Sequence, residues 1–333
     1  MKPTLVHRRE ARQAHLRERE GDLDPRVYDS LHRLSNLQGQ ARGVTFLPRR
    51  SVHSLLSGRR ASRLRGRGLN FEEIRAYHPG DDIRTIDWKV TARMRSPHAR
   101  VFTEERDRPA LVLIDQRIDM FYGTRWLMKS VAAAEAAALA AWGVLEAGDR
   151  VGAILFNDGE LREFRPRRSR ANVVQILGAV AQFNQALRAD LKVRANPAML
   201  NRALEAARRA ASHDFLVVLV SDFSGVDQES ERRLLQLSRH NDVIAALVHD
   251  PSASKLPMSR EFAISDGELQ VELPLGNRRT RERLERMSQG RIANVLGMQQ
   301  RFQMPVLPIS AGEEVVAQLQ RLLGQANQVG SSR

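Results

Sequence analysis

Three aspartates stand where a metal site could form. Asp115 follows the apolar run ALVLI, Asp119 lies in the loop beyond it, and Asp222 closes a second apolar run, FLVVLVS. Such runs are typical of strands buried on both faces of a parallel sheet, whose carboxyl ends meet at one edge. Carboxylate oxygens gathered at that edge suit a hard cation such as Mg²⁺. One hypothesis is therefore magnesium binding by these three residues.

The same carboxylates have an explanation that needs no metal. Single aspartates at strand ends often cap helices or pair with arginine, and Arg117 lies between Asp115 and Asp119. Its guanidinium could occupy the volume of an ion with a fixed positive charge. We favour this second explanation, and we expect no cofactor.

Other catalytic chemistry has little support in the sequence. The chain has no cysteine, which excludes disulfides and thiolate sites. The nine histidines form no zinc-protease pattern, and Arg65-Gly66-Arg67-Gly68 lacks the strand–turn–helix context of a dinucleotide loop. His78 fits a turn, and His249-Asp250 at a strand end is weak evidence for a site. We expect a protein that is not an enzyme and has no catalytic residues.

The elements that would position the aspartates alternate along the second part of the chain. Apolar runs predict strands at 110–114, 151–156, 215–220, 243–248 and 305–309, and 160–165 is expected to be the hairpin partner of 151–156. Helical periodicity predicts helices at 125–147, 170–187, 198–211, 229–239, 278–300 and 313–323. This alternation indicates an α/β fold with a doubly wound, mostly parallel sheet. Residues 261–264 and 269–273 read as a small hairpin.

The first third has a different texture. A helix is expected from Asp24-Pro25 to about Gln38, and strands at 70–77, 83–88 and 98–104 around the turn 78–81. The predicted division is a charged arm or helix at 1–40, a basic β-rich subdomain at 41–108, an α/β domain at 109–325 and a frayed tail at 326–333.

Positive charge is concentrated ahead of the sheet. The formal net charge of the chain is +14, and residues 1–108 hold 24 Lys and Arg against 14 Asp and Glu. An arginine-rich segment at 42–67 lies within a stretch that has no acidic residue. Such a segment can meet an acidic protein or nucleic acid. Because few aromatics interleave with the arginines, we rank the protein partner first and nucleic acid second. The N-terminus has no apolar signal core and no apolar run spans a bilayer, so we expect a soluble, cytoplasmic protein without membrane insertion.

The segment FEEIRAYHPGDDIRTIDWK is dense in opposite charges. Arg75, Arg84 and Lys89 could pair with the neighbouring carboxylates and hold a small subdomain together, with Tyr77 and Trp88 supplying apolar mass. A structural role is the favoured interpretation, and a partner- or ion-facing role for Asp81 and Asp82 is the alternative.

Residues 65–93, RGRGLNFEEIRAYHPGDDIRTIDWKVTAR, precede ALVLID and AGDRVGAILF, and this order of motifs resembles the bacterial domain of unknown function 58 family. The candidate motif or partner-binding residues are Arg65, Arg67, Glu73, Arg75, Tyr77, Asp81, Asp82, Arg84, Asp87 and Trp88.

The resemblance implies a von Willebrand factor A-like domain. Its metal-ion-dependent adhesion site would use D-x-S-x-S after the first strand, a Thr and a later Asp. Asp115 and Asp222 match the two Asp positions, but Arg117 and Asp119 replace the serines and the loop 194–197 has no hydroxyl. The resemblance therefore implies a degenerate site. It also implies a protein-interaction adaptor that acts with a MoxR-type AAA+ ATPase on an unknown client in chaperone-like or maturation work.

Overall fold

The computed structural model describes residues 23–42, 44, 69–78, 81–104, 108–189, 193–251, 261–265, 270–274, 295, 297 and 304–329. The chain divides into two compact units, here called the large unit (residues 1–51 and 108–333) and the small unit (residues 52–107). The predicted domain boundaries stay predictions. Among the described residues, no helix is both long enough and apolar enough to cross a membrane.

The large unit is built on a six-stranded sheet with the strand order β10-β7-β6-β3-β4-β5. Five strands are parallel, and β5 pairs antiparallel with β4 at one edge. The strands are β3 (Ala110–Asp115), β4 (Val151–Phe156), β5 (Leu161–Arg167), β6 (Leu216–Ser221), β7 (Asp242–His249) and β10 (Val306–Ser310). The predicted mixed α/β fold and its mostly parallel sheet are confirmed.

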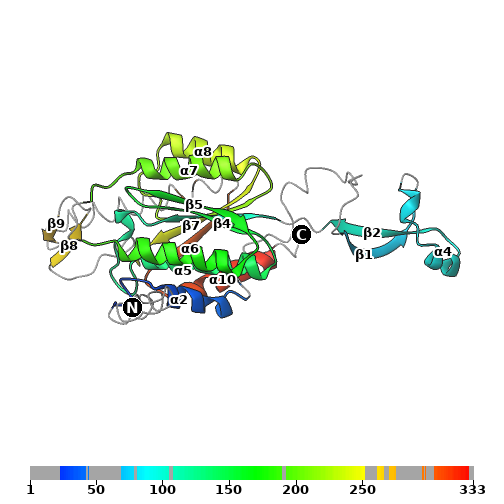
Figure 1. The fold of residues 1–333 in the computed structure, drawn as a ribbon, viewed down its shortest axis with the longest axis horizontal. Coiled ribbons are helices and arrows are strands. Elements are labelled where there is room, and N and C mark those ends of the chain that lie inside the picture. The colour runs from blue at the N-terminus through cyan, green and yellow to red at the C-terminus, as the bar shows by residue number, and fades with distance from the viewer. Residues whose placement is uncertain are drawn as a thin grey trace, which may run out of the picture. The chain divides into compact units, whose positions relative to one another are not determined.

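Alternate residues of each strand pack into two separate hydrophobic cores, because successive side chains point to opposite faces of a sheet. Val112 of β3 packs with helices α2, α5, α6 and α10, whereas Leu113 packs with α7 and α8 on the other face (Figure 1). The helices are α2 (Leu31–Asn36), α5 (Lys129–Glu146), α6 (Arg170–Gln185), α7 (Ala198–Ala210), α8 (Gln228–Ser238) and α10 (Val315–Val329). Short 3-10 helices form at η1 (Leu37–Gln40) and η3 (Ile118–Met120).

Helix α5 is the central helix of its layer. Most of its residues are buried, and many are alanines that let the helix approach its neighbours closely. Gly143 is one such point, since a Cβ there would lie 2.7 Å from the Val44 carbonyl oxygen. Gly148, with a φ of +86°, follows the helix end and takes the left-handed conformation that favours glycine.

The predicted N-terminal helix is shorter than the sequence suggests. It begins at Leu31, where the Ser30 side chain caps the backbone N–H of Arg33. Before it, Asp24 accepts a hydrogen bond from the Arg26 backbone, and the Asp29 N–H donates to the Asn184 side chain. The chain between them is therefore held by turn and tertiary hydrogen bonds, which compete with a continuous helix.

The small unit contains an antiparallel pair, β1 (Leu69–Ala76) and β2 (His98–Glu104), with a register shift between Phe71 and Glu73. The strand predicted at 83–88 is wrong. That segment forms the 3-10 helix η2 (Ile83–Thr85) and starts helix α4 (Trp88–Met94). Asp82 and Asp87 cause the difference, because each carboxylate accepts hydrogen bonds from backbone N–H groups of the turn that follows it.

A second two-stranded antiparallel sheet, β8 (Glu261–Ser265) with β9 (Gln270–Pro274), confirms the predicted hairpin. The helix predicted at 278–300 lies outside the described residues, apart from Val295 and Gly297. The arginine-rich segment 42–67 also lies outside them, apart from Arg42 and Val44.

Candidate functional site

The buried carboxylate of Asp115 is satisfied by groups of its own chain. The Arg117 guanidinium donates from Nε to Oδ1 at 3.0 Å and from Nη2 to Oδ2 at 2.7 Å. The Arg117 backbone N–H also donates to Oδ1 at 3.0 Å, and the Ser221 hydroxyl donates to Oδ2 at 2.6 Å. Asp115 is 0% exposed and Arg117 1% exposed. At the end of β3, a bidentate internal ion pair therefore takes both carboxylate oxygens.

Arg117 also lies in the field of the other two predicted aspartates. Burial lowers the pKa of the guanidinium, but the charge and hydrogen bonds of Asp115, with the charges of Asp222 and Asp119, outweigh it and raise the pKa above its usual value. The guanidinium carbon lies 5.7 Å from the centre of the Phe156 ring. Arg117 is thus a permanent cation at the carboxyl end of the sheet.

A second internal cation neutralises Asp222. The Lys129 ammonium, at the start of α5, forms an ion pair with the Asp222 carboxylate, and the Ser224 N–H donates to Oδ1 of the same carboxylate at 2.8 Å. Lys129 and Asp222 are both buried. Lys129 was not predictable from the sequence, because nothing in its local pattern indicates that the first residue of α5 meets the end of β6.

Asp158 joins the loops of this edge and was also missed. Its carboxylate accepts from the Ile118 N–H at 2.6 Å and from the Asn196 N–H at 2.8 Å. Burial raises the pKa of Asp158, although these two hydrogen bonds and the Arg117 charge oppose the shift. The available signal was Asp158-Gly159, a turn dipeptide directly after a buried strand.

The residues of this edge do not fit a divalent cation. Asp115 and Asp222 each accept from a cationic side chain, while Asp119, in η3, is only half-buried. Asn196, in the loop without a hydroxyl, uses its backbone and side-chain N–H groups on Asp158. Within the described ranges, no group of three His, Asp or Glu side chains is placed to hold a metal ion. A metal entering here would meet two fixed positive charges.

The weaker candidate His249-Asp250 has a structural explanation. The Asp250 carboxylate accepts from the Thr124 N–H at 2.8 Å and from the Thr124 hydroxyl at 2.6 Å. Burial lowers the pKa of His249, and the neighbouring charge of Asp250 opposes that shift. The two hydrogen bonds between Thr124 and Asp250 hold the loop that contains Thr124 at the same end of the sheet.

A chain of buried polar side chains links the N-terminal segment to this edge. The Asp29 N–H donates to Asn184 at 2.7 Å, Asn184 donates to Gln116 at 3.2 Å, and Gln116 donates to the Ser130 carbonyl at 2.9 Å. Within the described part of the chain, Oδ2 of Asp29 has no hydrogen-bond partner. Burial is the main cause that raises the pKa of Asp29 to about 7, with Arg33 opposing it and Glu135 adding to it.

Asp29→Asn is expected to flatten the pH dependence of stability. Because the folded-state pKa of Asp29 is raised, the folded chain binds an extra proton between about pH 4 and 7, and stability falls as the pH rises through that window. Between pH 5 and 7 the wild type should lose about 2 kcal/mol more than the variant. Urea unfolding at both pH values measures this difference, and equal slopes would contradict the assignment.

In the small unit, Arg75 and Asp81 form the predicted pairing. The guanidinium donates to both carboxylate oxygens at 2.8 Å, and the His78 N–H donates to Oδ2 at 2.9 Å. The Arg75 hydrogen bonds are the main cause that lowers the pKa of Asp81 to about 2. The Tyr77 hydroxyl donates to the Asp81 carbonyl at 3.2 Å. This cluster closes the turn between β1 and η2.

Asp87 pairs with a partner that the sequence analysis did not name. Its carboxylate accepts from the Arg100 Nε at 2.8 Å and caps α4 through the N–H groups of Lys89 and Val90. The Arg100 hydrogen bond, followed by the backbone bonds, lowers the pKa of Asp87. Trp88 was expected to supply buried apolar mass, but its side chain is 68% exposed because α4 turns it outward.

Of the remaining motif residues, Asp82 has a described hydrogen-bonding role. Asp82 caps η2 through the Arg84 N–H. Arg65 and Arg67 lie outside the described residues, and only the backbone of Glu73 is described. Among the described motif residues, Asp81 and Asp87 therefore each form an ion pair with an arginine, Arg75 and Arg100 respectively.

Comparison with known proteins identifies a family but assigns it no activity. The model of the family described as "Protein of unknown function DUF58" matches residues 73–293. Uncharacterized proteins of Mycobacterium bovis and Mycobacterium tuberculosis are 28% identical over 235 residues, which cover 70% of this chain and 71% of each relative.

Proposed function

This chain belongs to the DUF58 family, and from the chemistry of its sheet edge we propose that it is a protein-interaction adaptor without catalysis of its own. The observation that carries the proposal is the internal neutralisation of both strand-end aspartates, Asp115 by Arg117 and Asp222 by Lys129. A hydrolase using these carboxylates would need them open to a metal or substrate. An adaptor needs only a rigid sheet edge to which another protein can bind.

The proposal includes a fold relationship and a mode of binding. We interpret the large unit as von Willebrand factor A-like and its edge as a degenerate metal-ion-dependent adhesion site. The order of strands and the positions of Asp115 and Asp222 support this interpretation. In this interpretation the Arg117 guanidinium takes the place of the metal ion. It stiffens the loops at the sheet edge and does not exchange with cations from solvent.

The partner proposed from the family resemblance is a MoxR-type AAA+ ATPase. In this scheme the adaptor presents a client protein to the ATPase during chaperone-like or maturation work in the cytoplasm, where ATP is supplied. The basic first third supports a protein partner with an acidic surface, because opposite charges speed and orient association.

Co-purification tests this proposal. The tagged full chain, isolated from its native cells at low salt, should enrich an AAA+ ATPase over an unrelated tagged protein of similar charge. The recovered ATPase, purified and mixed with the chain, should bind it directly. Repeated isolation without any AAA+ ATPase, or failure of the purified pair to bind, would contradict the proposed partner.

Nucleic-acid binding through segment 42–67 is the second proposal, and the eight arginines of this segment favour it. It predicts that the affinity for labelled single-stranded DNA or RNA falls about 10³-fold or more between 50 and 200 mM salt. Fluorescence anisotropy measures this directly, and no binding even at the lower salt concentration eliminates the alternative.

A further inference from the structure

The small unit exposes most of the large apolar side chains that are open to solvent. Among the described residues, five large hydrophobic side chains are exposed, and only Trp126 belongs to the large unit. The others are Ile74 (36%), Ile83 (64%), Trp88 (68%) and Met94 (59%). Three of these lie on the consecutive elements η2 and α4. Three exposed large apolar side chains within twelve residues make this short segment a candidate interaction site.

The exposure follows from how the segment folds. Asp87 turns inward, where it caps α4 and pairs with Arg100, and Ala99 of β2 is buried. The polar anchor of α4 therefore faces the hairpin, while Trp88 at the first position of the helix faces solvent. At this point the small unit buries the carboxylate of Asp87 and exposes the indole of Trp88, which reverses the usual arrangement.

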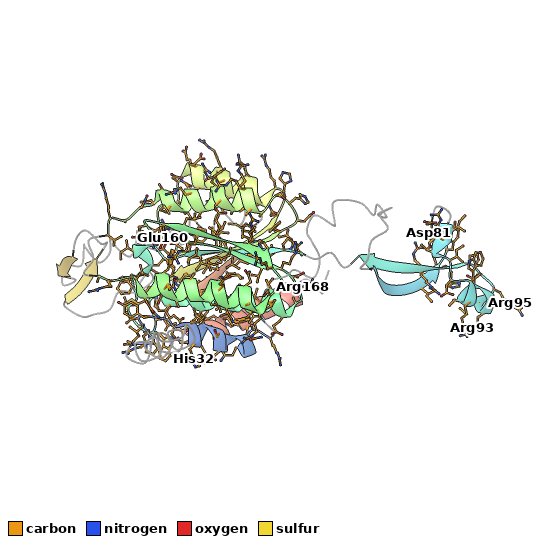
Figure 2. All side chains as sticks on the ribbon, in the orientation of Figure 1. His32, Asp81, Arg93, Arg95, Glu160 and Arg168 are labelled. Carbon is orange, nitrogen blue, oxygen red and sulfur yellow. The ribbon has the colours of Figure 1, made fainter. Side chains whose placement is uncertain are left out.

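Four basic side chains accompany the apolar ones. Arg84, Lys89, Arg93 and Arg95 are exposed, and none of them has a carboxylate partner among the described residues. Arg93 and Arg95 extend from the end of α4 (Figure 2). The acids of this segment are Asp82, which is exposed and caps η2 through the Arg84 N–H, and Asp87, which pairs with Arg100. We call Ile83, Trp88 and Met94 with these four basic residues the Trp88 surface.

We propose that the Trp88 surface docks an acidic amphipathic segment of a partner protein. Trp, Met and Arg are the residue types enriched at the centres of protein interfaces, where an indole commonly acts as an anchor. Four positive charges with no carboxylate partner in the described part of the chain, against the one exposed carboxylate of Asp82, favour acidic residues around that anchor and oppose a second copy of the same surface. The inference rests on the proposed function only in taking the partner to be a protein.

The fluorescence of Trp88 can report binding at the Trp88 surface. The chain has three tryptophans, of which Trp142 is buried, so Trp126→Phe leaves Trp88 as the exposed indole. The probe is a synthetic helical peptide with leucines on one face and glutamates on the other, added to the full chain. We expect a saturable blue shift of Trp88 emission, with an affinity that falls as salt rises.

Two variants and one control identify the surface. Lys89→Glu with Arg93→Glu should weaken peptide binding at least tenfold, and Met94→Ser should weaken it several-fold. Arg239→Glu, a charge reversal at the exposed end of α8, should leave the affinity unchanged. Circular dichroism of each variant checks that the fold is retained.

Several results would overturn the inference. They are no shift with the acidic peptide, an equal shift with a peptide that carries lysines in place of glutamates, or unchanged binding by the Lys89→Glu and Arg93→Glu variant. A shift with phosphatidylglycerol vesicles or an oligonucleotide but not with the peptide would assign the surface to another ligand. The peptide assay contains no ATPase. Failed co-purification would therefore contradict the proposed partner but would not contradict peptide binding at the Trp88 surface.

Discussion

Asp115→Ala is expected to lower the free energy of unfolding of the large unit by about 3–5 kcal/mol. The substitution leaves the Arg117 guanidinium buried with its main counter-charge removed. The guanidinium cannot escape this cost by deprotonating, because arginine stays charged at any accessible pH. The Ser221 hydroxyl also loses its acceptor. Urea unfolding followed by circular dichroism measures the change.

A double-mutant cycle separates the pair from simple loss of packing. Arg117→Met keeps most of the side-chain volume but leaves Asp115 unpaired, and combining it with Asp115→Ala should cost clearly less than the sum of the two. Asp24→Ala is a matched control, because Asp24 and Arg26 form the same bidentate pair at the same spacing on the surface. We expect no measurable change there. Additive effects at Asp115 and Arg117 would contradict the described coupling.

Trp142→Ala is expected to cost about 3–5 kcal/mol. The indole lies near the C-terminal end of α5 at 0% exposure, and its Nε1 donates to the Leu34 carbonyl at 3.1 Å. The Arg170 guanidinium lies 5.7 Å from its ring centre. Removal therefore opens a cavity and takes away a hydrogen bond that joins α2 to α5. Chemical denaturation gives the magnitude.

Two further variants test the reason for that loss. Trp142→Phe keeps part of the ring but leaves the Leu34 carbonyl without its donor, so about 1–3 kcal/mol is expected. Trp126→Phe, at an exposed indole, should change stability by less than about 0.5 kcal/mol. If the three variants were equally stable, the position of α2 against α5 would have to be revised.

The sheet was predictable from the sequence because its strands are buried on both faces. The runs at Ala110–Asp115, Val151–Phe156 and Leu216–Ser221 are apolar up to the final Asp115 and Ser221, and all their residues are buried. Their order and the turns between them specify an alternating α/β chain. These signals are local, so their bounds agree with the structure to within a residue or two.

The candidate site was predictable only in part, because its pairs join distant residues. Arg117 lies two positions from Asp115, and its competing role could be inferred from that spacing. Lys129 and Asp222 are 93 residues apart, and no local pattern links them. In the small unit, alternation at 83–88 indicated a strand, but the Asp82 and Asp87 caps favour helical turns and leave Trp88 exposed. Hydrophobicity alone could not show that exposure.

The central claim is that the chain's own cations neutralise the strand-end aspartates. Titration calorimetry of Mg²⁺ or Mn²⁺ into the full chain, paired with melting curves, tests it most directly. We expect no saturable heat and no rise in melting temperature at millimolar metal, and at most weak binding after Arg117→Ser, because the loop 194–197 supplies no hydroxyl. Stoichiometric binding that raises the melting temperature of the wild type, and is lost in Asp222→Asn, would contradict the account.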